Sequence, residues 1–223
     1  MGSRKDIKNL VKKGLVTVDG KTASDSGIRV DEILSDIRVE NIQIAYKKYI
    51  YLMMNKPDGY VSATFDKRLP TVLDLLDEYY LSFNPFPAGR LDIDTEGFVL
   101  LTNDGDLSHR ILSPKKHIKK TYLIKSDIRP TQSDIDIFKE GVVLDDGYKC
   151  AEAILVPDKD NISYLTITEG KFHQVKRMFE AVDNKVLYLK RISMGNLLLD
   201  ETLNPGEYRE LTEEELKLLC EEI

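Results

Sequence analysis

The chain has 223 residues, of which 42% are hydrophobic and 31% charged, and its formal net charge is −6. This length supports one well-packed core with a small additional unit, and no apolar run approaches the roughly 18 residues that a membrane-spanning helix needs. The two cysteines, Cys150 and Cys220, and the three histidines lack the spacing of a metal site. Two isolated cysteines and a polar N-terminal stretch, unlike a signal sequence, indicate a cytoplasmic protein.

The first 45 residues predict a small helix-and-strand unit. Ser3 can cap a helix that continues to Lys13, since apolar side chains recur there every three or four residues. Residues 16–23 read as two short strands about an Asp-Gly pair, which is typical of a β-hairpin. Residues 37–45 predict a second pair of strands.

From residue 46 onward the pattern predicts a larger unit. The expected strands are Tyr49–Met54, Phe98–Leu101, Thr121–Lys125, Val142–Leu144, Ala151–Val156, Ser163–Thr168 and Lys185–Ile192. The expected helical segments are Thr71–Tyr80, Ser108–Leu112, Thr131–Glu140, Phe172–Val182 and Thr212–Glu221. Strands outnumber helices and their links are short, so we predict the α+β class with a mixed, largely antiparallel sheet.

Positive charge is concentrated in two parts of this acidic chain. Residues 1–22 carry six basic side chains against two acidic ones, and residues 109–125 carry six with no acid. Residues 207–223 hold seven glutamates against two basic residues. A nucleic acid responds to the local field, so the net charge of −6 does not exclude an RNA partner. Solvated surfaces would also account for both basic stretches.

The acidic pair Asp92 and Asp94 lies just before the apolar run that starts at Phe98. If the pair lies on a strand, both carboxylates share one face. Such a pair could cleave a glycosidic bond, although neighbouring positions on one strand place the two groups poorly around a sugar. The spacing also resembles a calcium loop, but its twelfth position is Asn103 rather than Glu. A single aspartate acting as nucleophile beside a cation, or simple structural pairing of both acids, remains open.

Two further segments combine cations with aromatic residues. Residues 169–179 predict a Gly-containing turn followed by a helix that carries Lys176 and Arg177 away from its apolar face. Lys119 and Lys120 precede Tyr122, whose ring could stack on a base while the lysines bind phosphate. An ordinary amphipathic helix and a tyrosine at the edge of the core would explain the same patterns.

The sequences of five segments, and their order along the chain, point to a function more specifically than these patterns do. They read NKPDGYVSATFDKRLPTVLDLL from Asn55, GRLDIDTEGFVLLTNDG from Gly89, KKTYLI from Lys119, EGKFHQVKRMF from Glu169 and PGEYRELTEEE from Pro205. Together they closely resemble the pseudouridine synthases of the ribosomal small-subunit type, over essentially the whole chain from Tyr46. Residues 1–45 resemble the S4 RNA-binding module that precedes this catalytic domain, without the module's usual first helix. The resemblance thus implies domains of 1–45 and 46–223.

The resemblance implies isomerisation of a uridine in 16S ribosomal RNA, by a monomer with no cofactor and no metal. Asp92 would be the nucleophile or base, Tyr122 would lie against the base, and Lys176 would pair with Asp92. Arg90 would contact the RNA where the uridine leaves the stack. The other expected RNA contacts are Arg4, Lys5, Lys8, Lys12, Lys13, Lys119, Lys120 and Arg177. A synthase for 23S ribosomal RNA and a non-catalytic RNA-binding or assembly factor are the alternatives.

Overall fold

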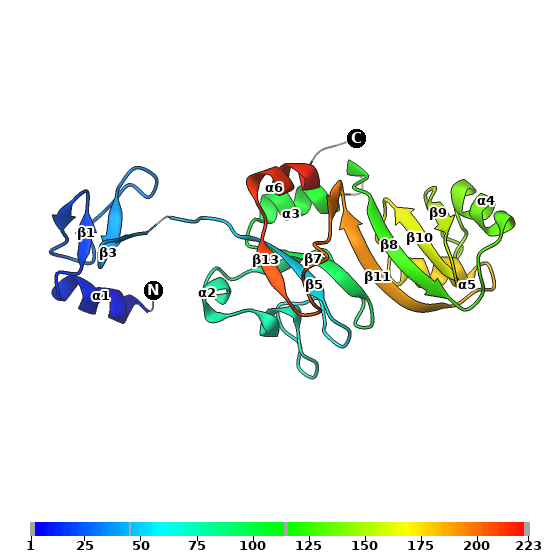
Figure 1. The fold of residues 1–223 in the computed structure, drawn as a ribbon, viewed down its shortest axis with the longest axis horizontal. Coiled ribbons are helices and arrows are strands. Elements are labelled where there is room, and N and C mark those ends of the chain that lie inside the picture. The colour runs from blue at the N-terminus through cyan, green and yellow to red at the C-terminus, as the bar shows by residue number, and fades with distance from the viewer. Residues whose placement is uncertain (1–2, 45, 114–115, 221–223) are drawn as a thin grey trace. The chain divides into compact units, whose positions relative to one another are not determined.

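A computed structural model describes residues 3–44, 46–113 and 116–220 of the chain. The chain divides into two compact units, residues 1–48 and 49–223 (Figure 1). Each unit has a hydrophobic core of its own. Among the described residues, no helix is both long enough and apolar enough to cross a lipid bilayer.

The first unit packs one helix with a small antiparallel sheet. Helix α1 (Arg4–Lys12) begins after Ser3, whose hydroxyl accepts from the backbone N–H of Asp6, while the Asp6 carboxylate accepts from the Ser3 N–H. In the order β2-β1-β3-β4, the strands are β1 (Val16–Val18), β2 (Lys21–Thr22), β3 (Ile37–Val39) and β4 (Ile42–Gln43). Val11 of α1 is buried with Val16 of β1. The predicted helix, hairpin and second strand pair are confirmed.

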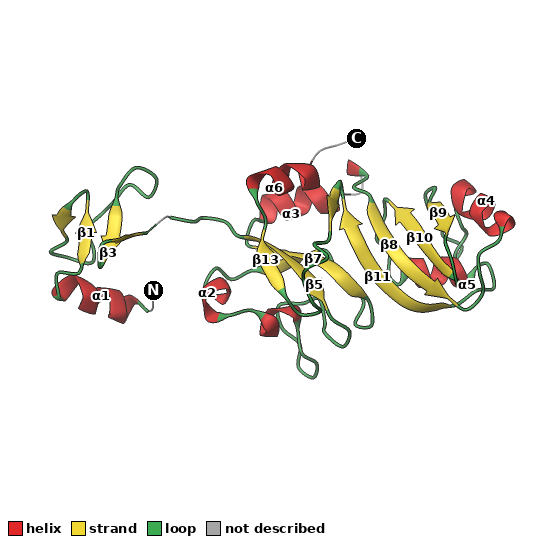
Figure 2. Ribbon diagram, viewed as in Figure 1, coloured by secondary structure: helices red, strands yellow, loops and turns green. Residues whose placement is uncertain are grey.

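The second unit is built on a nine-stranded sheet (Figure 2). Its order is β13-β5-β7-β11-β8-β10-β9, with β6 paired to β7 and β12 paired to β11. All of these pairs are antiparallel except β7 with β11. The strands are β5 (Tyr51–Lys56), β6 (Phe86–Ala88), β7 (Glu96–Thr102), β8 (Lys120–Ser126), β9 (Ile154–Pro157), β10 (Ile162–Ile167), β11 (Val186–Met194), β12 (Leu197–Leu198) and β13 (Tyr208–Glu210). The predicted α+β class and mixed, largely antiparallel sheet are confirmed.

Helices pack on both faces of this sheet. They are the 3-10 helix η1 (Val72–Leu75) and the α-helices α2 (Glu78–Leu81), α3 (Gly105–Leu112), α4 (Gln132–Glu140), α5 (Gln174–Glu180) and α6 (Glu213–Cys220). In β7, Val99 and Leu101 share a core with residues of α4 and α5, whereas Phe98 and Leu100 share another with α3 and α6. Successive strand side chains point to opposite faces, so a strand covered on both sides is apolar throughout.

Some predicted elements differ in the structure. The helix expected over Thr71–Tyr80 is divided into η1 and α2, because Leu76 is extended and the Asp77 side chain caps a new helix. The strand expected at Val142–Leu144 is absent from the described sheet; its central residue forms only an isolated bridge with Lys149. Strands β6, β12 and β13 were not predicted.

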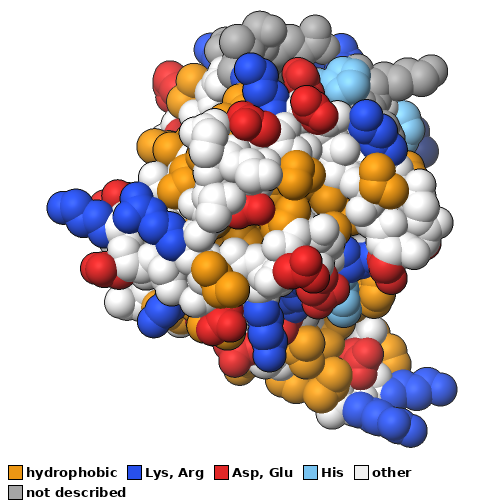
Figure 3. Space-filling view, turned by 90° about the vertical axis from the view of Figure 1, so that its right-hand side faces the viewer, with side chains coloured by type: hydrophobic (Ala, Val, Ile, Leu, Met, Phe, Trp, Pro, Cys, Tyr) orange, Lys and Arg blue, Asp and Glu red, His pale blue; other side chains and the backbone are white. Residues whose placement is uncertain are grey.

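The outer end of the second unit mixes side chains of different kinds. Edge strand β9 exposes Ile154 and Val156 to solvent, and in the view onto that end, acidic, basic and hydrophobic side chains intermingle (Figure 3). The face in that view therefore lacks, among the described residues, the concentrated positive charge of a typical nucleic-acid surface.

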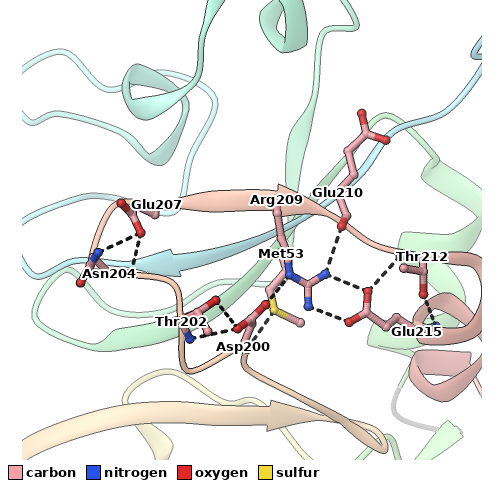
Figure 4. A network of polar contacts seen from close by, with 9 residues as sticks. All are labelled: Met53, Asp200, Thr202, Asn204, Glu207, Arg209, Glu210, Thr212 and Glu215. Atoms are coloured by element: carbon pink, nitrogen blue, oxygen red, sulfur yellow. Dashed lines mark hydrogen bonds and ion pairs between the residues drawn. The ribbon is translucent and has the colours of Figure 1, made fainter.

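An ion-pair network joins the last strand and helix to the sheet (Figure 4). Arg209 of β13 donates from Nε to Asp200 Oδ2 at 2.5 Å and from its two terminal nitrogens to the Glu215 carboxylate at 2.8 and 2.7 Å. The Asp200 N–H lies 3.2 Å from Met53 Sδ on β5. Hydrogen bonds from Thr202 and Arg209 lower the pKa of Asp200 to about 2. Part of the acidic C-terminal segment therefore serves this structural pairing.

Candidate active site

The segment around Asp92 is a loop between β6 and β7, not part of a strand. The Thr95 N–H donates to the Asp92 carbonyl oxygen at 3.1 Å, which closes a turn, and β7 begins only at Glu96. Asp92 and Asp94 therefore do not share a strand face. The turn nevertheless places both carboxylates near the same lysine, Lys176.

A buried lysine holds this loop in place. Lys56 lies at the end of β5 and is fully buried, and its Nζ donates to the carbonyl oxygens of Pro57 (2.9 Å), Ile93 (3.0 Å) and Thr95 (2.8 Å). An ammonium group has three N–H donors, so these acceptors satisfy all of them. Burial lowers the pKa of Lys56 to about 8, even though nearby carboxylates, Asp58 foremost, favour its charged form.

The segment after Lys56 adds two more attachments. The Ser62 hydroxyl donates to the Leu91 carbonyl oxygen at 3.0 Å and accepts from the Leu91 N–H at 3.1 Å. The Gly59 N–H donates to the Ile93 carbonyl oxygen at 2.9 Å. The backbone is thus fixed on both sides of Asp92. A carboxylate on so constrained a loop is positioned before any ligand arrives.

The Asp92 carboxylate lies between two nitrogen-bearing side chains. Lys176 Nζ is 3.7 Å from Asp92 Oδ2, and His173 Nε2 is 3.7 Å from Asp92 Oδ1. The Asp92 side chain is 27% exposed, so it is neither sealed in the core nor free in solvent. The predicted pairing of Asp92 with Lys176 is present as a long ion pair. The lysine stabilises negative charge on a carboxylate that a ligand can still reach.

Lys176 contacts Asp94 more closely than Asp92. Its Nζ donates to Asp94 Oδ1 at 2.6 Å. Burial acts to raise the pKa of Asp94, but the hydrogen bond and charge of Lys176 outweigh it and lower the pKa. One ammonium therefore serves two carboxylates, and Asp94 fixes it within reach of Asp92. This contact of Asp94 was not predicted from the sequence.

His173 reaches Asp92 because of an unusual backbone conformation. Helix α5 begins at Gln174, not at Phe172 as predicted, and His173 before it is left-handed with φ of 48°. That region is uncommon for residues other than glycine. The Gln174 Oε1 accepts from the Lys171 N–H at 2.9 Å, which closes the turn, and the His173 ring stacks on Phe172 with 3.8 Å between centroids.

A small hollow opens beside Asp92. Its walls include Arg90 and Thr95 from the loop, Tyr122 from β8, and His173. Tyr122 is buried, with 7% of its surface exposed, while Arg90 is exposed. A carboxylate and an aromatic ring that border one hollow can act at a sugar while a flat base lies against the ring.

The remaining predicted RNA contacts lie in different surroundings. Lys119 is exposed, whereas Lys120 is buried. The Arg177 guanidinium is bound by Asp145 and Asp146, so these acids already neutralise the charge that was predicted to contact RNA. The lysines and arginine predicted in the first unit are exposed on α1 or directly after it, namely Arg4, Lys5, Lys8, Lys12 and Lys13.

Comparison with known proteins decides what this arrangement is. A family model described as RNA pseudouridylate synthase matches residues 50–181, which include the Asp92 loop, Tyr122 and α5. The chain belongs to this family. The protein is therefore a pseudouridine synthase, an isomerase that acts on RNA.

Relatives of this pseudouridine synthase span most of its length. An "Uncharacterized RNA pseudouridine synthase YtzG" of Bacillus subtilis is 54% identical over 99% of this chain and 94% of the relative. The "Ribosomal small subunit pseudouridine synthase A" of Escherichia coli is 48% identical over 74% of this chain and 72% of the relative. A "Crystal structure of pseudouridylate synthase" matches with a TM-score of 0.73 and 36% identity, covering 97% of this chain and 94% of that one.

Replacing Lys176 with methionine is expected to reduce turnover by about 10- to 100-fold, which corresponds to losing about 1.4–2.8 kcal/mol of stabilisation, because the Asp92 carboxylate loses the cation 3.7 Å away. The variant removes the cation from Asp92 and leaves Asp94 unpaired. Pseudouridine formation under single-turnover conditions measures the effect. Lys185→Met, at an exposed lysine outside the hollow, is the matched control. A rate equal to that of the control would remove Lys176 from the active site.

Proposed function

We propose that this protein converts a specific uridine of 16S ribosomal RNA into pseudouridine, acting in the cytoplasm as a monomer without metal or cofactor. The reaction rests on one observation above all: Asp92 lies 3.7 Å from Lys176 and borders the same hollow as Tyr122. The small-subunit target is supported by the 48% identity to a relative whose name specifies the ribosomal small subunit.

The isomerisation of uridine to pseudouridine requires few groups besides these side chains. The bond between N1 of uracil and C1′ of ribose breaks, C5 of uracil joins C1′, the hydrogen on C5 leaves as a proton, and N1 takes up a proton, so the composition is unchanged. No electrons are gained or lost, and water is not consumed. Asp92 either bonds to C1′ and leaves again, or removes the 2′ proton; both routes need an ionised carboxylate, which Lys176 stabilises. Water entering the hollow would be a hazard to the intermediate.

The uridine has to leave the RNA stack to reach Asp92. Such extrusion costs a few kcal/mol, and the ring of Tyr122 offers a surface for the base in the hollow. Arg90 is exposed at the rim of the same hollow. We assign it to the place that the uridine vacates, or to the adjoining backbone.

The first unit is proposed to act as an S4-like RNA-binding module. Neutralising its exposed lysines in the double variant Lys12→Met/Lys13→Met should weaken RNA binding and flatten its salt dependence. Each lost phosphate contact reduces the slope of log Kd against log salt concentration by about 0.9. Titrations of labelled ribosomal RNA at several salt concentrations measure this slope. Lys21→Met, an exposed lysine on β2, is the control. An unchanged slope in the double variant would mean that Lys12 and Lys13 do not contact RNA.

The decisive experiment uses small-subunit particles and large-subunit particles whose RNA lacks pseudouridine. Each is incubated with the protein, and pseudouridine is then mapped chemically. A product at one uridine of the 16S RNA supports the proposal. Product only in 23S RNA would establish the large-subunit alternative. Binding of RNA with no product in either would favour a non-catalytic assembly factor.

A further inference from the structure

Two buried cations lie side by side in the sheet close to Tyr122. Arg191 of β11 is paired in register with Tyr122 of β8, and Lys120 precedes Tyr122 by two residues. Residues paired across strands, and residues two apart on one strand, share a face. Arg191 is 2% exposed and Lys120 is 8% exposed. Both side chains therefore lie on the Tyr122 face of the sheet.

Neither cation has a carboxylate partner among the described residues. Arg191 Nε donates to the Phe98 carbonyl oxygen at 2.8 Å, but Arg191 Nη2 is buried with no hydrogen-bond partner. Lys120 Nζ donates to the Ile118 carbonyl oxygen at 3.0 Å. No described acid lies within 4 Å of either charged group in an ion pair. Burial, followed by the positive charge of Arg191, lowers the pKa of Lys120 to about 8.

This arrangement is costly unless an anion enters it. A buried charge without a counter-ion loses its hydration and gains little in return. Here two like charges are close enough to disfavour each other, and a guanidinium N–H group is left without an acceptor. A negatively charged ligand with several acceptor oxygens would remove all three penalties at once.

A second hollow gives such a ligand access. It has a volume of about 530 Å³, within the range of ligand sites, and is lined by Lys120, Tyr122, Arg191, Lys171 and Arg90, among others. Tyr122, Arg90 and Lys171 also border the Asp92 hollow, so the two hollows adjoin.

Among the residues that the structure describes, one acid lines this second hollow, and its oxygens already accept hydrogen bonds. The Glu169 carboxylate accepts from the Tyr148 hydroxyl at 2.6 Å, the Ala151 N–H at 3.0 Å and Gln174 Nε2 at 2.9 Å. Three donors occupy it, and it forms no ion pair with Lys120 or Arg191. The unmatched charge of the hollow is therefore positive.

We propose that this second hollow binds a phosphate group of the RNA backbone, next to the extruded uridine, through Arg191 and Lys120. The inference rests on the proposed function insofar as that function brings RNA to the Asp92 hollow. A phosphodiester supplies one negative charge and two free acceptor oxygens. Arg191 Nη2 and Lys120 Nζ supply donors from adjacent strands. The contact reads no base, so it positions the strand and leaves sequence choice to other residues.

The test compares Lys120→Met with Lys125→Met, an exposed lysine of the same strand that does not line the hollow. Transcripts of 16S and 23S RNA are titrated at several salt concentrations with catalytically inactive Asp92→Asn protein carrying either change. Lys120→Met should raise Kd by about 10- to 100-fold and reduce the salt slope by about 1. Lys125→Met should change neither. Lys120→Arg, which keeps the charge, should restore most of the affinity; affinity lost equally in Lys120→Met and Lys120→Arg indicates a packing role and overturns the inference.

Inorganic phosphate tests the same hollow without RNA. Phosphate, compared with chloride at equal ionic strength, should raise the Tm of the wild type and of Lys125→Met more than that of Lys120→Met. If phosphate raises the Tm only when Lys120 is present, but Lys120→Met binds RNA with unchanged affinity, the hollow is a site for free phosphate and the RNA proposal is overturned. Wild-type affinity and salt slope in folded Lys120→Met overturn it as well. Pseudouridine mapping is scored separately, so a wrong RNA target would not be mistaken for a missing phosphate site.

Discussion

Replacing Asp92 with asparagine should abolish pseudouridine formation, with a loss on the order of 10⁴-fold or more, typical of removing a covalent or proton-abstracting group. The change keeps the size of the side chain and removes its charge. Lys176 retains Asp94 as a partner at 2.6 Å, and the loop keeps its attachments to Lys56 and Ser62. The release of tritium from C5 of labelled uridine in RNA, which accompanies formation of the new bond, measures turnover directly.

The same variant should bind RNA almost as tightly as the wild type. Asp92 carries negative charge, and the contacts that hold the backbone are cationic, so affinity does not depend on it. Asp106→Asn, at an exposed acid in the first turn of α3, is the matched control for the loss of one carboxylate. Turnover that survives in Asp92→Asn would refute the assignment of Asp92, whatever the RNA target proves to be.

Local sequence patterns were sufficient to predict the capped helices and the central buried strand. Helix α1 has its cap at Ser3, and α4 has Thr131 with Asp134 in the same arrangement. The run Phe98–Leu101 predicted a buried strand because both faces of β7 are covered. The predicted pair of strands over residues 37–45 turns at Glu40 and Asn41, which both adopt positive φ between β3 and β4.

The site itself was predictable only in part. Asp92, Tyr122, Lys176 and Arg90 were identified through the family resemblance. In the structure Asp92, Tyr122 and Arg90 line one hollow, and Lys176 Nζ lies 3.7 Å from Asp92 Oδ2. The contact between Lys176 and Asp94 joins residues 82 positions apart, and no local pattern reveals it. His173 reaches Asp92 through a left-handed backbone that depends on the surrounding turn.

The burial of Lys120 and Lys56 could have been predicted from the alternation of side chains along their strands. Lys120, Tyr122 and Ile124 alternate along β8 and are all buried, so the period of two placed Lys120 on the inner face. Lys120 was instead interpreted as one of the surface cations of residues 109–125. Lys56 likewise continues the buried run of β5 and is fully buried. A lysine in phase with buried neighbours is better interpreted as an internal donor than as a surface charge.

Replacing Lys56 with methionine should lower both stability and turnover. Methionine fills similar volume but donates nothing, so the carbonyl oxygens of Pro57, Ile93 and Thr95 lose a common donor. The Ile93 oxygen keeps the Gly59 N–H as a donor, whereas the buried Thr95 oxygen loses the Lys56 donor. One buried polar group left without a partner costs about 1–3 kcal/mol, so we expect the free energy of unfolding to fall by about that amount. Urea denaturation, followed by circular dichroism, measures this loss from the shift in midpoint at constant slope.

The effect of Lys56→Met on turnover separates positioning from folding. Measured at low temperature in protein that is still folded, the rate should fall by about 100-fold, the cost of misplacing a reacting group by roughly 1 Å. RNA affinity should change little, because Lys56 is fully buried and contacts only the loop backbone. Lys149→Met, which lies far along the chain near α4, should alter neither property. A folded Lys56→Met protein with normal turnover would show that the Asp92 loop keeps its geometry without this lysine, and that Ser62 and Gly59 are sufficient to hold it.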